Sequence, residues 1–206
     1  MRYGMVIDLS RCMGCQTCAT SCKLANNLPA KVWWNTVYTE GNTTIDCAAG
    51  DYPNNLTLQH WPVACQHCTN AVCLEVCPTG ATYKDEETGI VMVDAETCIG
   101  CQTCMTGCPY NVRVYLETEP AYAVDFACGY ADAPKHVVNT VEKCTLCKNL
   151  LDKGEDPFCV QACVGKARFF GDFDDPESAV SKLIAEREYV QLLPEQGTQP
   201  NVYYLK

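Results

Sequence analysis

The sequence predicts an α+β fold in which an internal repeat relates two units of short strands, short helices and cysteine-rich loops. Three observations support this prediction. First, sixteen of the eighteen cysteines fall in four short runs. Second, the segments 12–22 and 98–108 are identical at eight of eleven positions, which indicates a repeat. Third, the apolar segments 3–8 and 90–94, each ending in an apolar residue and Asp, precede these runs and predict strands.

The cysteine run of residues 98–109 carries the most specific signal. Its spacing, C-x2-C-x2-C-x3-C-P, is typical of bacterial iron–sulfur proteins, in which the first three thiolates bind one cluster and the fourth binds the neighbouring cluster. Gly100 is expected to give the loop the backbone dihedrals that a tight turn around a cluster needs. One run of this kind therefore requires a second.

Four runs are present, with the middle gap widened in the second and the fourth. Exchange of the fourth cysteines between paired runs predicts four ligand groups, one for each of four [4Fe–4S] clusters. These groups are Cys12, Cys15, Cys18 and Cys163 (cluster one); Cys65, Cys68, Cys73 and Cys108 (cluster two); Cys98, Cys101, Cys104 and Cys77 (cluster three); and Cys144, Cys147, Cys159 and Cys22 (cluster four). Cys47 and Cys128 remain outside these groups, and we expect Cys47 to be a structural thiol.

Two other uses of cysteine explain the pattern less well. A disulfide framework suits small secreted chains, whereas 206 residues that are 48% hydrophobic can build a core without cross-links. Zinc held by four thiolates is the stronger alternative, although zinc sites usually draw separate C-x2-C pairs rather than three ligands from one loop. His67 lies between two cysteines of the second run, and we expect it to support the ligands rather than to replace one.

The order of the runs predicts the domain organisation. Residues 63–112 form one bacterial ferredoxin-like dicluster unit, with a β-hairpin that pairs 81–83 with 90–93. Residues 1–30 and 140–175 form a second, discontinuous ferredoxin-like unit that holds clusters one and four. There, Ala167–Phe170 should pair with Tyr3–Ile7.

The remaining segments are predicted to lie outside these units. Residues 31–62 and 113–139 are insertions. Residues 176–206 are a C-terminal helix, starting at Pro176, and a tail that runs along a surface for partner docking.

Composition and the absence of certain motifs exclude several classes of function. The net charge of −10, to which four clusters would add roughly −8, argues against a nucleic-acid partner. No apolar run is long enough for a membrane span, and we expect no signal peptide. No nucleophile constellation, G-x-G-x-x-G loop or P-loop is present, so we predict electron transfer rather than an enzyme activity of the chain itself.

The four runs, their order and the eleven-residue gap after Cys147 resemble the iron–sulfur subunit of the dimethyl sulfoxide reductase family of molybdenum enzymes. The resemblance covers about residues 3–175 and includes Cys-Pro-Thr-Gly-Ala at 77–81 and Cys-Pro-Tyr at 108–110. One departure is Val164, which follows Cys163 where many relatives have proline.

The resemblance implies a relay between a large catalytic subunit with a molybdenum or tungsten bis-pterin cofactor and an electron donor. That donor is a quinol-oxidising membrane subunit or a soluble carrier, and the catalytic subunit would be an S-oxide or N-oxide reductase or a related anaerobic reductase, including aromatic dehydroxylases. It also implies a complex at the cytoplasmic membrane, exported with its catalytic partner, with a cytoplasmic location as the alternative. A free-standing soluble polyferredoxin is the alternative function.

Overall fold

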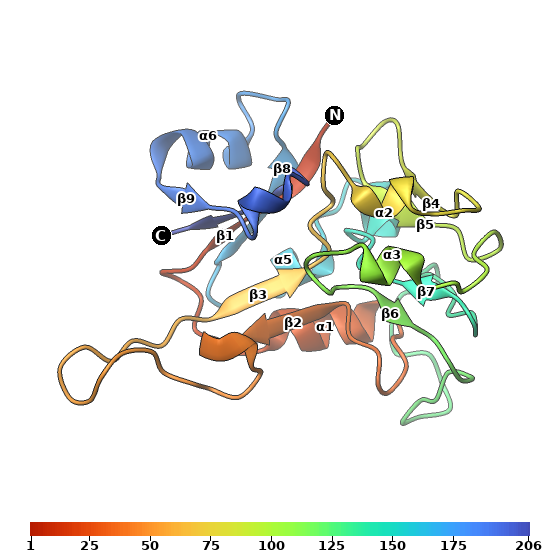
Figure 1. Ribbon diagram of the computed structural model, residues 1–206, viewed down its shortest axis with the longest axis horizontal. Helices are drawn as coiled ribbons and strands as arrows, with labels where there is room; N and C mark the ends of the chain where they lie inside the picture. The colour runs from red at the N-terminus through yellow and green to blue at the C-terminus, as the bar shows by residue number, and fades with distance from the viewer.

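The largest sheet of the computed structural model, which describes residues 1–206, has four strands in mixed orientation (Figure 1). The strand order is β8 (Arg168–Asp172), β1 (Tyr3–Asp8), β10 (Val202–Leu205) and β9 (Tyr189–Val190). β1 is buried along almost its whole length, because its run of apolar residues meets protein on both faces. The first strand of the chain is therefore a central strand.

The pairing of β1 with β8 is the long-range contact that the repeat predicts. The strands are antiparallel, with Met5 opposite Phe170 and Ile7 opposite Arg168. The predicted pairing of Tyr3–Ile7 with Ala167–Phe170 is therefore confirmed for residues 168–170, while Ala167 precedes β8 and its carbonyl accepts from the N–H of Asp8 at 2.7 Å.

The C-terminal tail does not follow the surface as expected. β10 lies between β1 and β9, pairs parallel to β1 and is buried at all four residues. Its side chains join the core, where the hydroxyl of Tyr204 donates to the carbonyl of Pro62 at 3.0 Å. The expectation of a surface tail is wrong for these residues, because Val-Tyr-Tyr-Leu gains more from burial than from exposure. Residues 202–205 are not available for partner docking.

The C-terminal helix starts later than expected. α6 (Ala179–Glu186) begins three residues after Pro176, because the Ser178 side chain accepts from the N–H of Ser181 and caps the helix. Val180 on its inner face is fully buried against the sheet. A 3₁₀ turn, η2 (Pro194–Gln196), follows β9.

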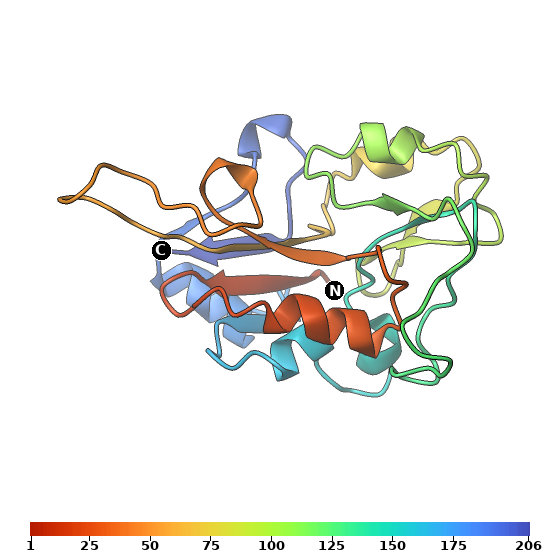
Figure 2. The ribbon, with the colours of Figure 1, turned by 90° about the horizontal axis from the view of Figure 1, so that it is seen from below.

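Three hairpins complete the strand pairs. β4 (Thr82–Lys84) pairs with β5 (Val91–Val93), which confirms the predicted hairpin, and β6 (Val114–Tyr115) pairs with β7 (Val141–Glu142). β2 (Asn35–Tyr38) pairs with β3 (Trp61–Ala64), and the segment between them, which includes η1 (Glu40–Asn42), extends away from the body in Figure 2.

The helices near the cysteine runs are short, and all but one carry candidate ligands. α1 (Thr17–Ala25) carries the last two cysteines of the first run, Cys18 and Cys22. The others are α2 (Val72–Glu75), α3 (Thr103–Thr106), α4 (Lys148–Leu151) and α5 (Phe158–Gln161). No helix combines the length and the hydropathy that crossing a bilayer requires.

Candidate iron–sulfur sites

The structure brings the cysteines together in four groups that have the same members as the predicted groups. Three cavities are lined by Cys12, Cys15, Cys18 and Cys163; by Cys77, Cys98, Cys101 and Cys104; and by Cys22, Cys144, Cys147 and Cys159. The fourth group is close enough for its thiols to interact electrostatically, and it comprises Cys65, Cys68, Cys73 and Cys108. In every group the fourth cysteine comes from a different run.

The loops of the first and third runs have the same backbone conformation. Gly14 and Gly100 have positive φ angles of 70° and 67°, and Gln16 and Gln102 have φ angles of 61° and 60° before α1 and α3. A side chain at Gly100 would place its Cβ only 2.3 Å from the Asn139 carbonyl oxygen. Glycine is therefore needed here for both dihedral and space, as the sequence predicts for Gly100.

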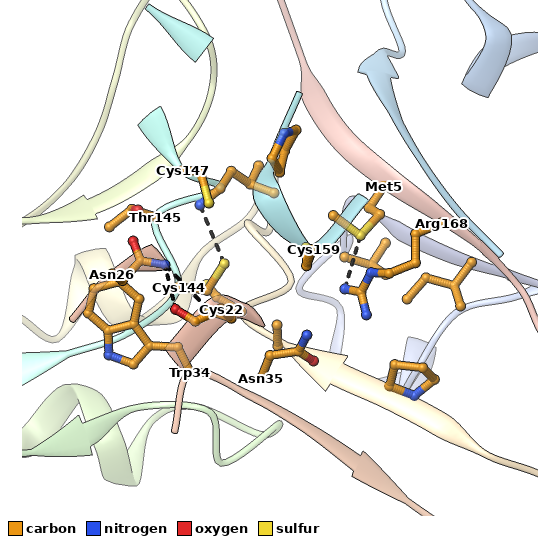
Figure 3. Close-up of a pocket in the computed structure, with 17 residues that line it drawn as sticks. Met5, Cys22, Asn26, Trp34, Asn35, Cys144, Thr145, Cys147, Cys159 and Arg168 are labelled. Carbon is orange, nitrogen blue, oxygen red and sulfur yellow. Dashed lines mark hydrogen bonds between the residues drawn. The ribbon is translucent and has the colours of Figure 1, made fainter. Parts of the chain in front are cut away.

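The third cavity named above shows how closely the thiols of one group gather. Figure 3 places Cys22, Cys144, Cys147 and Cys159 around it, with Asn26 beside Cys22. Burial raises the pKa of Cys22 well above its usual value, and the charges of the other three thiols raise it further. Burial likewise raises the pKa of Cys144, and that of Cys147 to about 11. Four such thiols can ionise together only around a positively charged centre.

Hydrogen-bond donors are directed at the sulfur atoms. The backbone N–H of Thr82 donates to Cys77 Sγ at 3.4 Å, and that of Ala167 donates to Cys163 Sγ at 3.2 Å. The side-chain amide of Asn26 lies 3.6 Å from Cys22 Sγ. N–H groups around the sulfurs are a general feature that tunes iron–sulfur clusters, so the donor set fits this cofactor.

The arrangement does not fit single ions. No three cysteine, histidine, aspartate or glutamate side chains converge on a point that one metal ion could occupy. Three of the groups instead line cavities, which suits a polynuclear cluster bound at its corners better than a zinc site.

His67 lies in the position expected of a supporting residue. Its ring is buried, and its Nδ1 accepts from the N–H of Val91 at 3.2 Å, which leaves the proton on Nε2. Burial raises the pKa of Cys65, but the charge of Lys143 and hydrogen bonds from His67 to the thiol outweigh burial and lower it to about 5. Cys65 is thus prepared to bind metal as a thiolate.

Three buried cations near the cysteine groups are not identifiable from the sequence. Arg113, Lys143 and Arg168 are 4%, 2% and 5% exposed. Nothing in the spacing of the runs marks them, because their burial depends on tertiary contacts between distant segments. The only local signal is the position of Lys143 immediately before Cys144.

Cys47 and Cys128 are both exposed and take no part in the four groups. The expectation that Cys47 is a structural thiol is wrong in the sense of a packed residue, since it lies in the extended segment between β2 and β3.

Comparison with known proteins agrees with this site. A family model described as a 4Fe-4S dicluster domain matches residues 56–128 and 117–173. The chain is 46% identical to the dimethyl sulfoxide reductase iron–sulfur subunit proposed for Halobacterium salinarum, over 98% of this chain and 78% of the relative.

Two further relatives extend over the whole chain. A selenate reductase subunit of Mesobacillus selenatarsenatis is 39% identical over 100% of this chain and 72% of its own length. The arsenate respiratory reductase iron–sulfur subunit of Shewanella sp. strain ANA-3 is 35% identical over 100% of this chain and 97% of its own.

Proposed function

Because this chain belongs to the family of iron–sulfur electron-transfer subunits of dimethyl sulfoxide reductase-type complexes, we propose that it relays electrons through four [4Fe–4S] clusters. The number of clusters is inferred from the gathering of sixteen cysteines into four groups of four. Each cluster would accept and release one electron at a time, and the chain supplies only its ligands and surroundings.

The ligands in this proposal are the four groups defined above. In each group the fourth ligand comes from the paired run. The second and third runs are therefore assigned to one unit, residues 63–112, and the first and fourth runs to a discontinuous unit, residues 1–30 with 140–175. The shared sheet supports this division, since β1 and β8 come from the two ends of the second unit. All irons would be fully ligated, which leaves no open position for a substrate and is consistent with a role in transfer alone.

Contacts between groups support the spatial order one, four, two, three. Cys159 of group four lies near Cys18 and Cys163 of group one, whose charges add to the effect of burial and raise its pKa. Cys65 of group two lines the cavity of group four, and its charge likewise adds to burial in raising the pKa of Cys144. Groups two and three lie within one unit.

The two ends of this order are open to solvent. Cys15 of group one and Cys101 of group three are exposed, whereas group four is largely buried. Met13 and Ile99, one in each of these terminal loops, are 62% and 64% exposed. Apolar residues beside an exposed cluster suit transient or permanent docking of a redox partner. Electrons would enter at one end and leave at the other.

The partners follow from the relatives. We propose a large catalytic subunit with a molybdenum or tungsten bis-pterin cofactor at one end and a quinol-oxidising membrane subunit or a soluble donor at the other. The complex would lie at the cytoplasmic membrane, exported together with the catalytic subunit. The substrate class is that of an S-oxide, N-oxide or related oxyanion reductase, in line with the names of the relatives.

Metal analysis of the protein purified anaerobically with its bound partners tests this proposal. About sixteen irons per chain, interacting cubane signals in EPR of the reduced sample, and stoichiometric molybdenum or tungsten from a large partner are expected. Sixteen irons in an isolated chain would instead indicate a free-standing polyferredoxin. Zinc with little iron would refute both.

A further inference from the structure

Three buried cations have no carboxylate partner. Arg113, Lys143 and Arg168 take part in none of the ion pairs of the structure, although each is at least 95% buried. Burial of an unpaired charge is costly, so it persists only where a counter-charge is supplied. The anionic groups that all three side chains face are cysteine thiolates, which would bind the clusters.

Arg168 lies between groups one and four. Its side chain lines both of their cavities, and Figure 3 places it on the Cys159 side of the cavity of group four, beside Met5. Its Nη2 lies 3.1 Å from the sulfur of Met5, and its Nε and Nη1 have no partner in the protein. Burial lowers the pKa of Arg168, but the thiolates of Cys159 and Cys18 outweigh it and raise the pKa. These two cysteines belong to different groups.

Lys143 lies between groups four and two. Its Nζ donates to the carbonyl of Cys144 at 2.9 Å and to the carbonyl of Val91, which belongs to the other unit. Burial lowers the pKa of Lys143, and the thiolate of Cys65 opposes this effect most strongly. The ammonium group therefore contacts both units at the place where they meet.

Arg113 lies between groups two and three. Its Nη1 donates to the hydroxyl of Thr82 at 3.2 Å, and its Nη2 has no partner. The thiolates that act on it are Cys73 and Cys65 of group two and Cys104 of group three. One cation thus lies at each of the three junctions in the order one, four, two, three.

We propose that these three residues are positioning residues of the relay, each of which stabilises an added electron on both clusters that flank it: Arg168 on one and four, Lys143 on four and two, and Arg113 on two and three. This inference rests on the proposed function. An electron adds one negative charge to a cluster, and a fixed positive charge beside it favours that state. Because the cation adjoins both clusters, the stabilisation is kept when the electron crosses the junction.

Substitution of Arg113 separates charge from packing. Arg113→Gln removes the charge and keeps donors, whereas Arg113→Lys keeps the charge in a smaller side chain. Lys182→Gln, at an exposed lysine paired with Glu177, is the matched control. The readout is the midpoint potential of each cluster, measured by EPR during a redox titration of the anaerobically purified holoprotein.

The expected result is specific to one pair of clusters. Arg113→Gln should shift the reduction equilibria of clusters two and three at least about tenfold towards the oxidised form, which is about 59 mV for one electron. Clusters one and four should shift less than about threefold, as should all clusters in Arg113→Lys and Lys182→Gln. Arg168→Gln should act in the same way on clusters one and four, and Lys143→Met on clusters four and two.

Equal shifts in all four clusters, equal shifts in Arg113→Gln and Arg113→Lys, or shifts no larger than those of Lys182→Gln would overturn the inference. If Arg113→Gln fails to assemble its clusters, iron content decides: Arg113→Lys should then retain the full iron content, and loss from both variants rejects the role of charge. A wild-type chain with little iron would refute the proposed function, whereas sixteen irons without the pairwise shifts would refute only this inference.

Discussion

Replacement of Cys22 tests whether the fourth cysteines are exchanged between runs. Cys22 is buried in α1, and the structure groups it with cysteines 120 or more residues away rather than with the first run. Cys22→Ala should therefore remove cluster four. Because each cluster holds a quarter of the iron, the content should fall from about sixteen to about twelve per chain.

The control is a cysteine of the same run that belongs to another group. Cys15→Ala, seven residues earlier, should cause the same fall in iron but abolish the EPR signal of cluster one instead. Cys163→Ala should abolish the signal of cluster one as well, although Cys163 lies in the fourth run. Cys47→Ala should leave the iron content unchanged.

The comparison of EPR difference spectra between variants gives the decisive result. If Cys22→Ala and Cys15→Ala abolish the same signal, each run binds its own cluster and the exchange is wrong. If Cys22→Ala abolishes a different signal and Cys163→Ala matches Cys15→Ala, the exchange holds for both clusters of this unit.

Three further predictions concern the surroundings of the clusters. Gly100→Ala should destabilise the native state by about 1–2 kcal/mol for its positive φ alone, plus the cost of a clash with a backbone carbonyl, and should speed iron loss from cluster three. Gly154→Ala, at a φ of 75° with open space around it, should lose only the stability that the positive φ costs. Equal losses of stability in Gly100→Ala and Gly154→Ala would contradict the role of the clash. Tyr204→Phe should cost about 1–3 kcal/mol because a buried carbonyl loses its donor, and an unchanged thermal midpoint would contradict this. Burial lowers the pKa of His136, but Glu142 outweighs it and raises that pKa, so the pair stabilises the fold fully below the unfolded pKa of about 6.5 and ceases to do so as pH rises through the raised value. Thermal midpoints of His136→Gln and wild type should therefore differ at low pH and converge at high pH.

The parts of the site that the sequence predicted depend on covalent spacing and on the repeat. Three ligands within one loop are held together by the chain itself, and the likeness of the segments 12–22 and 98–108 transfers the geometry of one loop to the other. The repeat also predicted the pairing of β1 with β8, since an apolar strand before the first run needs the same partner as the strand before the third. These contacts are encoded locally or by internal analogy.

The parts that were missed depend on contacts between distant segments. β10 pairs with β1 across almost the whole chain, and no local pattern specifies a parallel partner at that separation. The burial of Arg113, Lys143 and Arg168 likewise depends on tertiary packing, since arginine and lysine are usually exposed. From sequence alone, an arginine or lysine is assigned to the surface unless a buried negative partner has already been identified.

In the proposed relay, the junction between groups four and two gives a reason for placing two dicluster units in one chain. Within each proposed unit, the exchanged cysteines would hold two clusters close together without further help. Between units no cysteine is shared, so the distance from group four to group two depends on non-covalent contacts, among them the bonds of Lys143 to Val91 and Cys144. Two separate ferredoxins would meet at this junction only by diffusion, whereas covalent fusion in one chain would keep it permanently assembled. The same junction is therefore the place where a packing defect should slow transfer while leaving all four clusters in place.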